Sequence, residues 1–217
     1  MASDLADVEF VVRVIAQTAV DNEEAFCQLD SVVGDGDFGY SLARGFEIIL
    51  AEWETLDRSS PGSFLQKVAM IITGRVGGTS GPIWGTAFLR AAMAVRNHDS
   101  VDGPAVVDML DQAIAGIKTR GGAEVGEKTL LDSLVPLRDT VARLVAEGAS
   151  SQTVIDTAAA TARTAGEETS ALQARRGRAS YTGERSIGSP DAGAIAIAVM
   201  AERIAKLWPE RVTDRAS

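Results

Sequence analysis

The chain has 217 residues, of which 46% are hydrophobic and only 5% aromatic. This composition, without a linker rich in proline, glycine and serine, predicts one domain over residues 1–217 and favours close-packed helices over a β-sandwich. The formal net charge of −9 argues against nucleic-acid and anionic-membrane partners, which the protein would repel, but does not exclude a phosphate ligand bridged by a metal.

The N-terminal sequence MASDLADVEF carries acidic residues and lacks a basic, apolar leader, so no secretory signal is expected. No segment reaches the apolar length of a membrane span. The single cysteine, Cys27, allows no internal disulfide and fits a reducing compartment. These features predict a cytoplasmic protein without a membrane partner.

Apolar residues at helical spacing predict an all-α protein of eight helices. The first carries Val8, Val12 and Ile15 on one face and brings Asp30 to its C-terminal end. Pro136 falls inside the sixth and predicts a kink there. In chain order the expected helices cover approximately residues 3–28, 42–56, 61–73, 82–96, 104–118, 129–146, 153–173 and 191–207.

Three irregular stretches interrupt this pattern, at residues 30–41, 74–82 and 174–191. Binding and catalytic residues concentrate on loops that a rigid scaffold positions. We therefore expect the functional residues in these three stretches.

The first stretch places Asp30, Asp35 and Asp37 within eight residues, with glycines beside the last two. Crowded carboxylates repel one another unless they are protonated, solvated apart or bridged by a cation. An all-oxygen ligand set suits Mg²⁺ or Ca²⁺ rather than zinc. The alternative is a solvated turn rich in aspartate and glycine, since the spacing is not that of an EF-hand.

The second stretch, GRVGGTSGPIWG, begins at Gly74 and leads directly into a predicted helix. Free backbone N–H groups at a helix N-terminus can bind an anion, although this is not a Walker A loop. The alternative is a glycine-rich connection between two tightly packed helices.

The third stretch contains several arginines in an otherwise acidic chain. Guanidinium groups match phosphate oxygens, and Arg178 is the favoured phosphate ligand. For Arg175 and Arg176 a solvated turn that pairs with surface acids is the preferred interpretation. Asp191 follows Pro190 and most simply caps the last helix.

Four stretches resemble the L subunit of dihydroxyacetone kinases, the nucleotide-binding half of that enzyme. They are GDGDFG (34–39) with ARGFE (43–47), GGTSGPIWGTAFLRAA (77–92), GEKTLLDSLVP (126–136) and GRASYTGERSIGSPDAGA (177–194). The matches occur in order along nearly the whole chain and are far more specific than a single glycine motif.

The resemblance implies a closed barrel of eight antiparallel amphipathic helices, with ADP or ATP and two Mg²⁺ ions bound at one end. By position, it implies Asp30, Asp35 and Asp37 as metal ligands and Arg178 as the catalytic residue, because phosphoryl transfer mainly needs positioning and charge neutralisation. The implied nucleotide contacts are Gly78, Thr79, Ser80, Gly81, Leu130, Arg178, Phe38, Ser41 and Asp191.

In this family a histidine of a separate K subunit holds the ketose covalently. The resemblance therefore implies a kinase subunit that is inactive without a K-type partner. In relatives of the phosphotransferase system, a phosphoprotein is a further partner. His98 is the one histidine here and reads as a surface residue, which agrees with this division. The alternatives are a nucleotide-bound regulatory module without turnover and a structural domain with a calcium-stabilised loop.

The first stretch departs from the usual family motif, which has His at Phe38 and commonly Thr and Asn at Tyr40 and Ser41. These changes alter the polar contacts expected beside the metals. One hypothesis is that Phe38 and Tyr40 form an aromatic pair at the barrel mouth. Such a pair would go with a different partner surface or with a different ketose substrate, such as four-carbon erythrulose.

Overall fold

The computed structural model describes residues 5–98 and 100–214, and the chain is helical without strands over that range. The α-helices are α1 (Leu5–Asp21), α2 (Glu23–Ser31), α3 (Phe38–Ala51), α4 (Pro61–Arg75), α5 (Ser80–Ala94), α6 (Gly103–Gly121), α7 (Leu131–Ala146), α8 (Ser151–Glu168) and α9 (Ala192–Asp214). Short 3-10 segments occur at η1 (Trp53–Thr55), η2 (Thr169–Ala171) and η3 (Arg178–Ser186). The all-α prediction is confirmed.

The helix count was wrong by one, because the first predicted helix is two helices. Asn22 separates α1 from α2 with φ −109° and ψ 17°, outside the helical range. Its side-chain amide donates to the carbonyl oxygen of Thr18 at 2.8 Å and so competes with the backbone ladder. The predicted start at residue 3 lies outside the described residues.

Side-chain caps explain several other boundaries. At the starts of α4, α6 and α8, the side chains of Ser60, Asp102 and Ser150 each accept a hydrogen bond from one backbone N–H. In each case the donor is the residue three positions later in the chain. Pro61 begins α4, where its missing N–H costs no hydrogen bond. These caps fix where three of the long helices begin.

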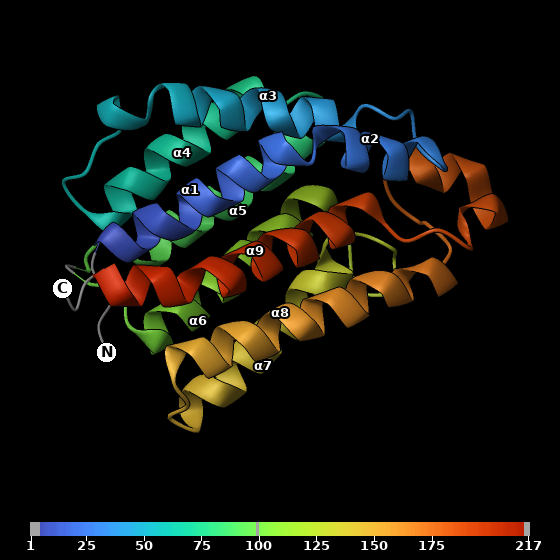
Figure 1. Cartoon of the computed structure of the whole chain (residues 1–217). Helices are drawn as coiled ribbons and strands as arrows, with labels where there is room; N and C mark the ends of the chain where they lie inside the picture. The colour runs from blue at the N-terminus through green and yellow to red at the C-terminus, as the bar shows by residue number, and fades with distance from the viewer. Residues whose placement is uncertain (1–4, 99, 215–217) are drawn as a thin grey trace.

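Successive helices lie roughly antiparallel and pack against their neighbours in chain order from α3 to α9 (Figure 1). Helix α1 packs against both α3 and α9. In Figure 1, the start of α1 and the end of α9 lie at the left, whereas the end of α2 and the segment after α8 lie at the right. The loops 32–37, 76–79, 122–130 and 169–191 therefore gather at the right-hand end.

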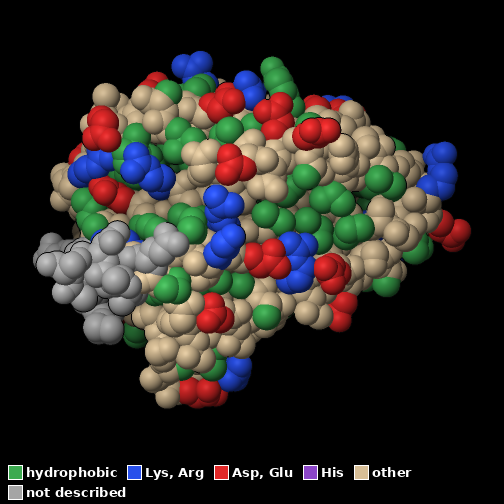
Figure 2. Space-filling model, in the orientation of Figure 1, with side chains coloured by type: hydrophobic (Ala, Val, Ile, Leu, Met, Phe, Trp, Pro, Cys, Tyr) green, Lys and Arg blue, Asp and Glu red, His purple; other side chains and the backbone are tan. Residues whose placement is uncertain are grey.

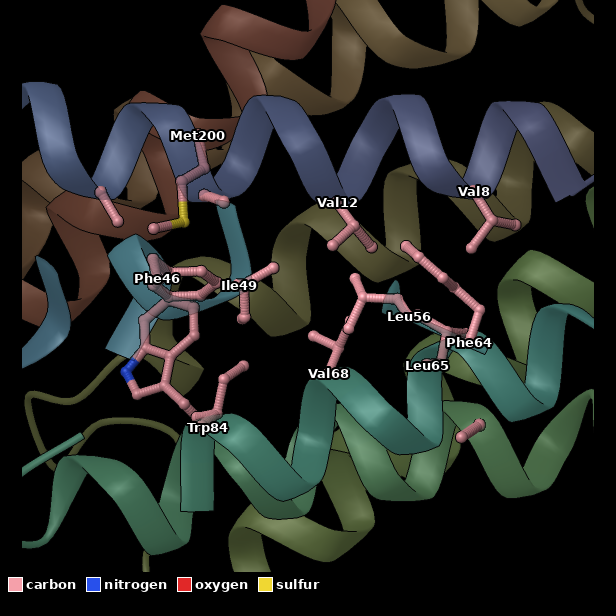
Figure 3. Close-up of a cluster of buried hydrophobic side chains, with 14 of the residues drawn as sticks. Val8, Val12, Phe46, Ile49, Leu56, Phe64, Leu65, Val68, Trp84 and Met200 are labelled. Atoms are coloured by element: carbon pink, nitrogen blue, oxygen red, sulfur yellow. The ribbon is translucent and has the colours of Figure 1, made fainter. Parts of the chain in front are cut away.

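The main core lies between α1, α3, α4, α5 and α9 (Figure 3). Phe46 and Ile49 from α3 point toward Trp84 of α5, and Val12 of α1 faces Val68 of α4. All of these side chains are buried. Burial of a large apolar side chain contributes about 1.5 to 3 kcal/mol, so this core holds the loop-bearing ends of the helices in place.

Helices α4 and α5 approach closely because glycines line their contact. A Cβ atom on Gly85 would collide with the side chain of Thr73, and one on Gly81 would collide with the backbone oxygen of Val76. Both glycines are buried. Their lack of a side chain sets the position of the loop between the two helices.

The face seen in Figure 2 mixes acidic and basic side chains rather than presenting one sign of charge. Among the ion pairs between helices, Arg163 of α8 pairs with Glu202 of α9 at 2.6 Å, and Arg203 lies 3.9 Å from Asp21 of α1. None of the helices between residues 5 and 214 combines the length and apolar character that a membrane crossing requires.

Candidate functional site

The structure brings the three predicted aspartates together at the loop-bearing end of the molecule. One carboxylate oxygen from each of Asp30, Asp35 and Asp37 lies within 4.8 Å of the other two. Asp30 is in the last turn of α2, and the other two follow in the loop before α3. Gly36, with φ 75°, makes the tight turn between them and donates its N–H to Asp30 Oδ2 at 2.8 Å.

The charges of this cluster contribute to the pKa of Asp30, although burial is the larger cause. Its pKa is raised, first by burial and further by the charges of Asp35 and Asp37, while backbone N–H groups of Phe38 and Gly36 lower it. A divalent cation would relieve this repulsion, because it favours the ionised carboxylates.

Asp37 occupies the N-cap position of α3, yet its side chain makes no capping hydrogen bond. The carboxylate of a capping aspartate normally accepts a backbone N–H from the following turn. The Asp37 carboxylate is therefore not needed for helix α3 and remains available as a ligand. Three oxygen donors in this arrangement fit Mg²⁺ or Ca²⁺.

Phe38 and Tyr40 do not form the expected aromatic pair at the mouth. The Phe38 ring turns inward and packs against Phe26, with ring centroids 6.0 Å apart. Tyr40 is 55% exposed, and the guanidinium of Arg44 lies over its ring at 5.1 Å. Tyr40 therefore presents an exposed ring in the first turn of α3, whereas Phe38 is partly buried against Phe26, and the two rings are not paired.

The glycine-rich loop 76–79 enters α5 next to the aspartate cluster. A Cβ atom on Gly77 would lie 3.0 Å from Ser41 Oγ, which places this loop against the first turn of α3. Gly78 has φ 60° and open space around it. In the described part of the chain, the hydroxyls of Thr79 and Ser80 have no hydrogen-bonding partner, so both can meet a ligand.

The third loop reaches the same cluster through Arg178. Its guanidinium forms an ion pair with Asp35, although its side chain is 65% exposed. Arg176 instead pairs with Glu127 at 2.6 Å, as the interpretation of a solvated turn expects. Of these two arginines, Arg178 pairs with the aspartate cluster and Arg176 does not.

Leu130 and Asp191 immediately precede α7 and α9 and lie close together around Gly193. A Cβ atom on Gly193 would meet the Cβ of Leu130 at 3.3 Å. Asp191 Oδ2 accepts the N–H of Ala194 at 2.8 Å, which confirms its capping role at α9. A nucleotide contact at either residue stays a prediction.

The pKa of Asp191 is raised to about 7, first by burial and then by the nearby charge of Asp132. In the nucleotide-free protein the native state therefore keeps a proton that the unfolded chain releases near pH 4. This contribution to the free energy of unfolding is present below about pH 4 and is lost as pH rises through 7.

Asp191→Asn is expected to remove this pH dependence, since asparagine stays neutral and still caps a helix. The variant should be more stable than the wild type at pH 8, with the difference vanishing toward pH 4. Urea unfolding at several pH values measures this, and Asp102→Asn at the cap of α6 is the matched control. A stability difference that does not change with pH would contradict the assignment.

Sequence reasoning missed two buried residues that shape this end of the molecule. Asp132 accepts the N–H groups of Gly126 at 2.5 Å and Thr129 at 2.7 Å, and so orders the turn before α7. Lys128 is also buried. Both lie in the GEKTLLD stretch, which carried the family resemblance but gave no sign of burial.

The family model described as the DAK2 domain matches residues 32–206 of this chain. Over 177 residues the chain is 35% identical to the "PEP-dependent dihydroxyacetone kinase, ADP-binding subunit DhaL" of Escherichia coli, which covers 82% of this chain and 84% of that one. It is also 35% identical over 196 residues to the "L-erythrulose 1-kinase" of Mycolicibacterium smegmatis, covering 88% of this chain but 33% of the relative. The chain thus spans about one third of that longer relative.

The fold is also similar to that of the dihydroxyacetone kinase of C. freundii. The crystal structure of that kinase in complex with AMP-PNP and Mg²⁺ superposes with a TM-score of 0.74 at 24% identity. The match covers 95% of this chain and 34% of the longer one. At this level of identity the likeness establishes the arrangement of the helices alone.

Proposed function

Because the chain belongs to the DAK2 domain family, we propose that it is the nucleotide-binding subunit of a dihydroxyacetone-type kinase, which acts on a hydroxyl of a short ketose. The observation that carries the proposal is the meeting of Asp30, Asp35 and Asp37 within 4.8 Å. Arg178 pairs with this cluster, and the glycine-rich loop lies beside it. Carboxylates, a glycine-rich loop and an arginine together suit a magnesium nucleotide.

In this proposal the three aspartates hold two Mg²⁺ ions. When bound, such ions neutralise negative charge on the phosphates. Asp30 is fixed by its hydrogen bond from Gly36, whereas Asp35 and Asp37 are exposed and can adjust to the ligand. One ligand is therefore rigid and two are adaptable.

The residues Gly78 to Gly81 bind the nucleotide in this proposal. The open space around Gly78 lets phosphate oxygens approach the backbone, and the hydroxyls of Thr79 and Ser80 can donate to them. The N-terminus of α5 adds a partial positive charge. Ser41, Leu130 and Asp191 are further proposed contacts from the surrounding loops.

Arg178 is the proposed catalytic residue. Its guanidinium already pairs with Asp35 of the cluster, a position from which it can neutralise charge on a transferring phosphoryl group. No protein nucleophile is required for such a transfer. The ketose would be held by a separate K-type subunit, and the chain alone would not phosphorylate it. A phosphotransferase-system phosphoprotein is a second proposed partner.

The proposal includes a closed barrel of eight helical staves, with α1 and α2 counted as one stave. The packing of α1 against both α3 and α9 supports this closure. The nucleotide would lie at the end where the four loops gather. Dihydroxyacetone and erythrulose are both candidate ketoses, and exposed Tyr40 is the residue that could distinguish them at the surface.

The proposal is tested by denaturing freshly purified protein and quantifying released nucleotide and magnesium. Near-stoichiometric ADP with magnesium supports a retained nucleotide, and empty protein that binds ATP only with Mg²⁺ supports an exchanging kinase. Reconstitution with a K-type subunit then measures phosphoryl transfer to dihydroxyacetone and to erythrulose. Absence of nucleotide binding, or binding without transfer in the complex, would overturn the kinase assignment.

Arg178→Ala is expected to weaken nucleotide binding about 10- to 150-fold while Mg²⁺ binding persists. A hydrogen bond to a charged partner contributes about 1.5 to 3 kcal/mol, which corresponds to that range. Titration calorimetry with MgADP measures the change. Arg176→Ala is the control, because it breaks only an exposed pair with Glu127 in the same loop. An equal loss of metal binding would make Arg178 a structural residue.

A further inference from the structure

Lys128 combines two features that are unusual for a lysine. It is only 2% exposed, and its backbone has φ 62°, the left-handed region that favours glycine. It is the one non-glycine residue with positive φ in the described ranges. A left-handed conformation is unfavourable for a residue with a Cβ atom, so contacts of the side chain must offset this cost.

The ammonium group of Lys128 donates three hydrogen bonds, all to backbone oxygens of one loop. It donates to Leu172 at 3.1 Å, to Ser186 at 2.5 Å and to Ser189 at 2.6 Å. Leu172 lies before η3, whereas the other two residues lie at its end and beyond. One buried cation therefore holds both ends of the segment 172–189.

The same segment is closed by its own hydrogen bonds. Gly188 donates its N–H to the carbonyl oxygen of Ser170 at 2.8 Å, and Ala174 donates to Ser186 Oγ at 2.9 Å. Between these contacts η3 projects with Tyr181 fully at the surface and Arg178 turned toward Asp35. The direction in which Arg178 points thus depends on how the base of this loop is held.

From this geometry we propose that Lys128 is a positioning residue, which fixes the loop 172–189 and thereby directs Arg178 to the aspartate cluster. This inference rests on the proposed function, because the position of Arg178 matters for phosphoryl transfer only if Arg178 binds the phosphates. Lys128 itself is buried, and its ammonium donors all go to backbone oxygens of this loop. Its effect passes through the three carbonyl groups and the backbone of η3.

Limited trypsin digestion of the ligand-free protein tests the hold on the loop. The segment contains four cleavage sites, at Arg175, Arg176, Arg178 and Arg185. Lys128→Met keeps the length of the side chain but removes all three donors, so cleavage in this loop should become about tenfold faster or more. Lys118→Met removes an exposed lysine that pairs with Glu124 and should leave the loop protected. Equal protection in wild type and Lys128→Met would overturn the proposal.

A double-mutant cycle tests whether Lys128 acts through Arg178. Lys128→Met should weaken MgADP binding about tenfold in the wild-type background and less than about twofold in the Arg178→Ala background, because coupled residues are not additive. Additive losses would show a general structural role and overturn the inference. Lys128→Gln keeps part of the donor set and should lie between wild type and Lys128→Met in both assays.

Helical content by circular dichroism should be unchanged in both variants, because the contacts of the Lys128 ammonium are confined to one loop. Loss of the helical fold in both would overturn a positioning role. The two proposals can fail separately. Wild-type protein that binds no magnesium nucleotide refutes the proposed function, whereas the trypsin experiment still decides whether Lys128 holds the loop.

Discussion

Asp37→Asn is expected to lower the affinity for MgADP by roughly 100-fold or more, about 3 kcal/mol, while the helices remain folded. The Asp37 carboxylate makes no capping hydrogen bond to α3, so an asparagine of the same shape costs the fold little. It removes one hard ligand from a set of three, and the phosphates then face a less neutralised site.

Titration calorimetry with MgADP measures this affinity, and circular dichroism monitors the fold. Asp57→Asn is the control, because Asp57 is an exposed aspartate in the loop between α3 and α4, outside the four loops of the site. Asp30→Asn would be a poorer test, since Asp30 also accepts the N–H of Gly36 and supports the turn. Wild-type affinity in Asp37→Asn would refute the metal-site assignment.

Gly81→Ala is expected to lower the free energy of unfolding by about 2 to 3 kcal/mol and to abolish nucleotide binding. The added Cβ would collide with the backbone oxygen of Val76 and lie 3.5 Å from that of Ile72. Backbone atoms cannot move aside as a side-chain tip can, so α5 must shift away from α4. The loop 76–79 would move with it.

Urea unfolding measures this loss, and Gly74→Ala provides a matched control. Gly74 lies in the last turn of α4 with nothing within 4 Å of the position of its Cβ, so alanine there should stabilise the helix by up to about 1 kcal/mol. If both alanine variants behave alike, the collision at Gly81 is not what limits the packing of α4 and α5.

The sequence was sufficient to predict the all-helical class and most helix positions, because apolar spacing and capping residues are local signals. It did not reveal the break at Asn22, since the competing hydrogen bond to Thr18 depends on one rotamer. The inward turn of Phe38 was equally hidden, because it depends on the ring of Phe26 in another helix.

For the site, spacing alone identified the aspartates as candidates, and the resemblance added the nucleotide contacts. Their convergence could be confirmed only in three dimensions, as with Arg178, which reaches Asp35 from a distant loop. No local sequence pattern indicated that Lys128 would be buried. In the sequence GEKT it resembles an ordinary solvated lysine, and only the tertiary structure surrounds it with carbonyl groups.

The packing of α1 against α9 has a consequence for the order of folding. The other extensive helix contacts join segments that are neighbours or near neighbours in the chain, whereas this contact joins its two ends. Closing so long a loop carries the largest entropic cost, so the α1–α9 seam should form late and exchange its amide hydrogens early. A circular permutant that links α9 to α1 and opens the turn at 147–150 would turn this seam into a local hairpin and fold faster.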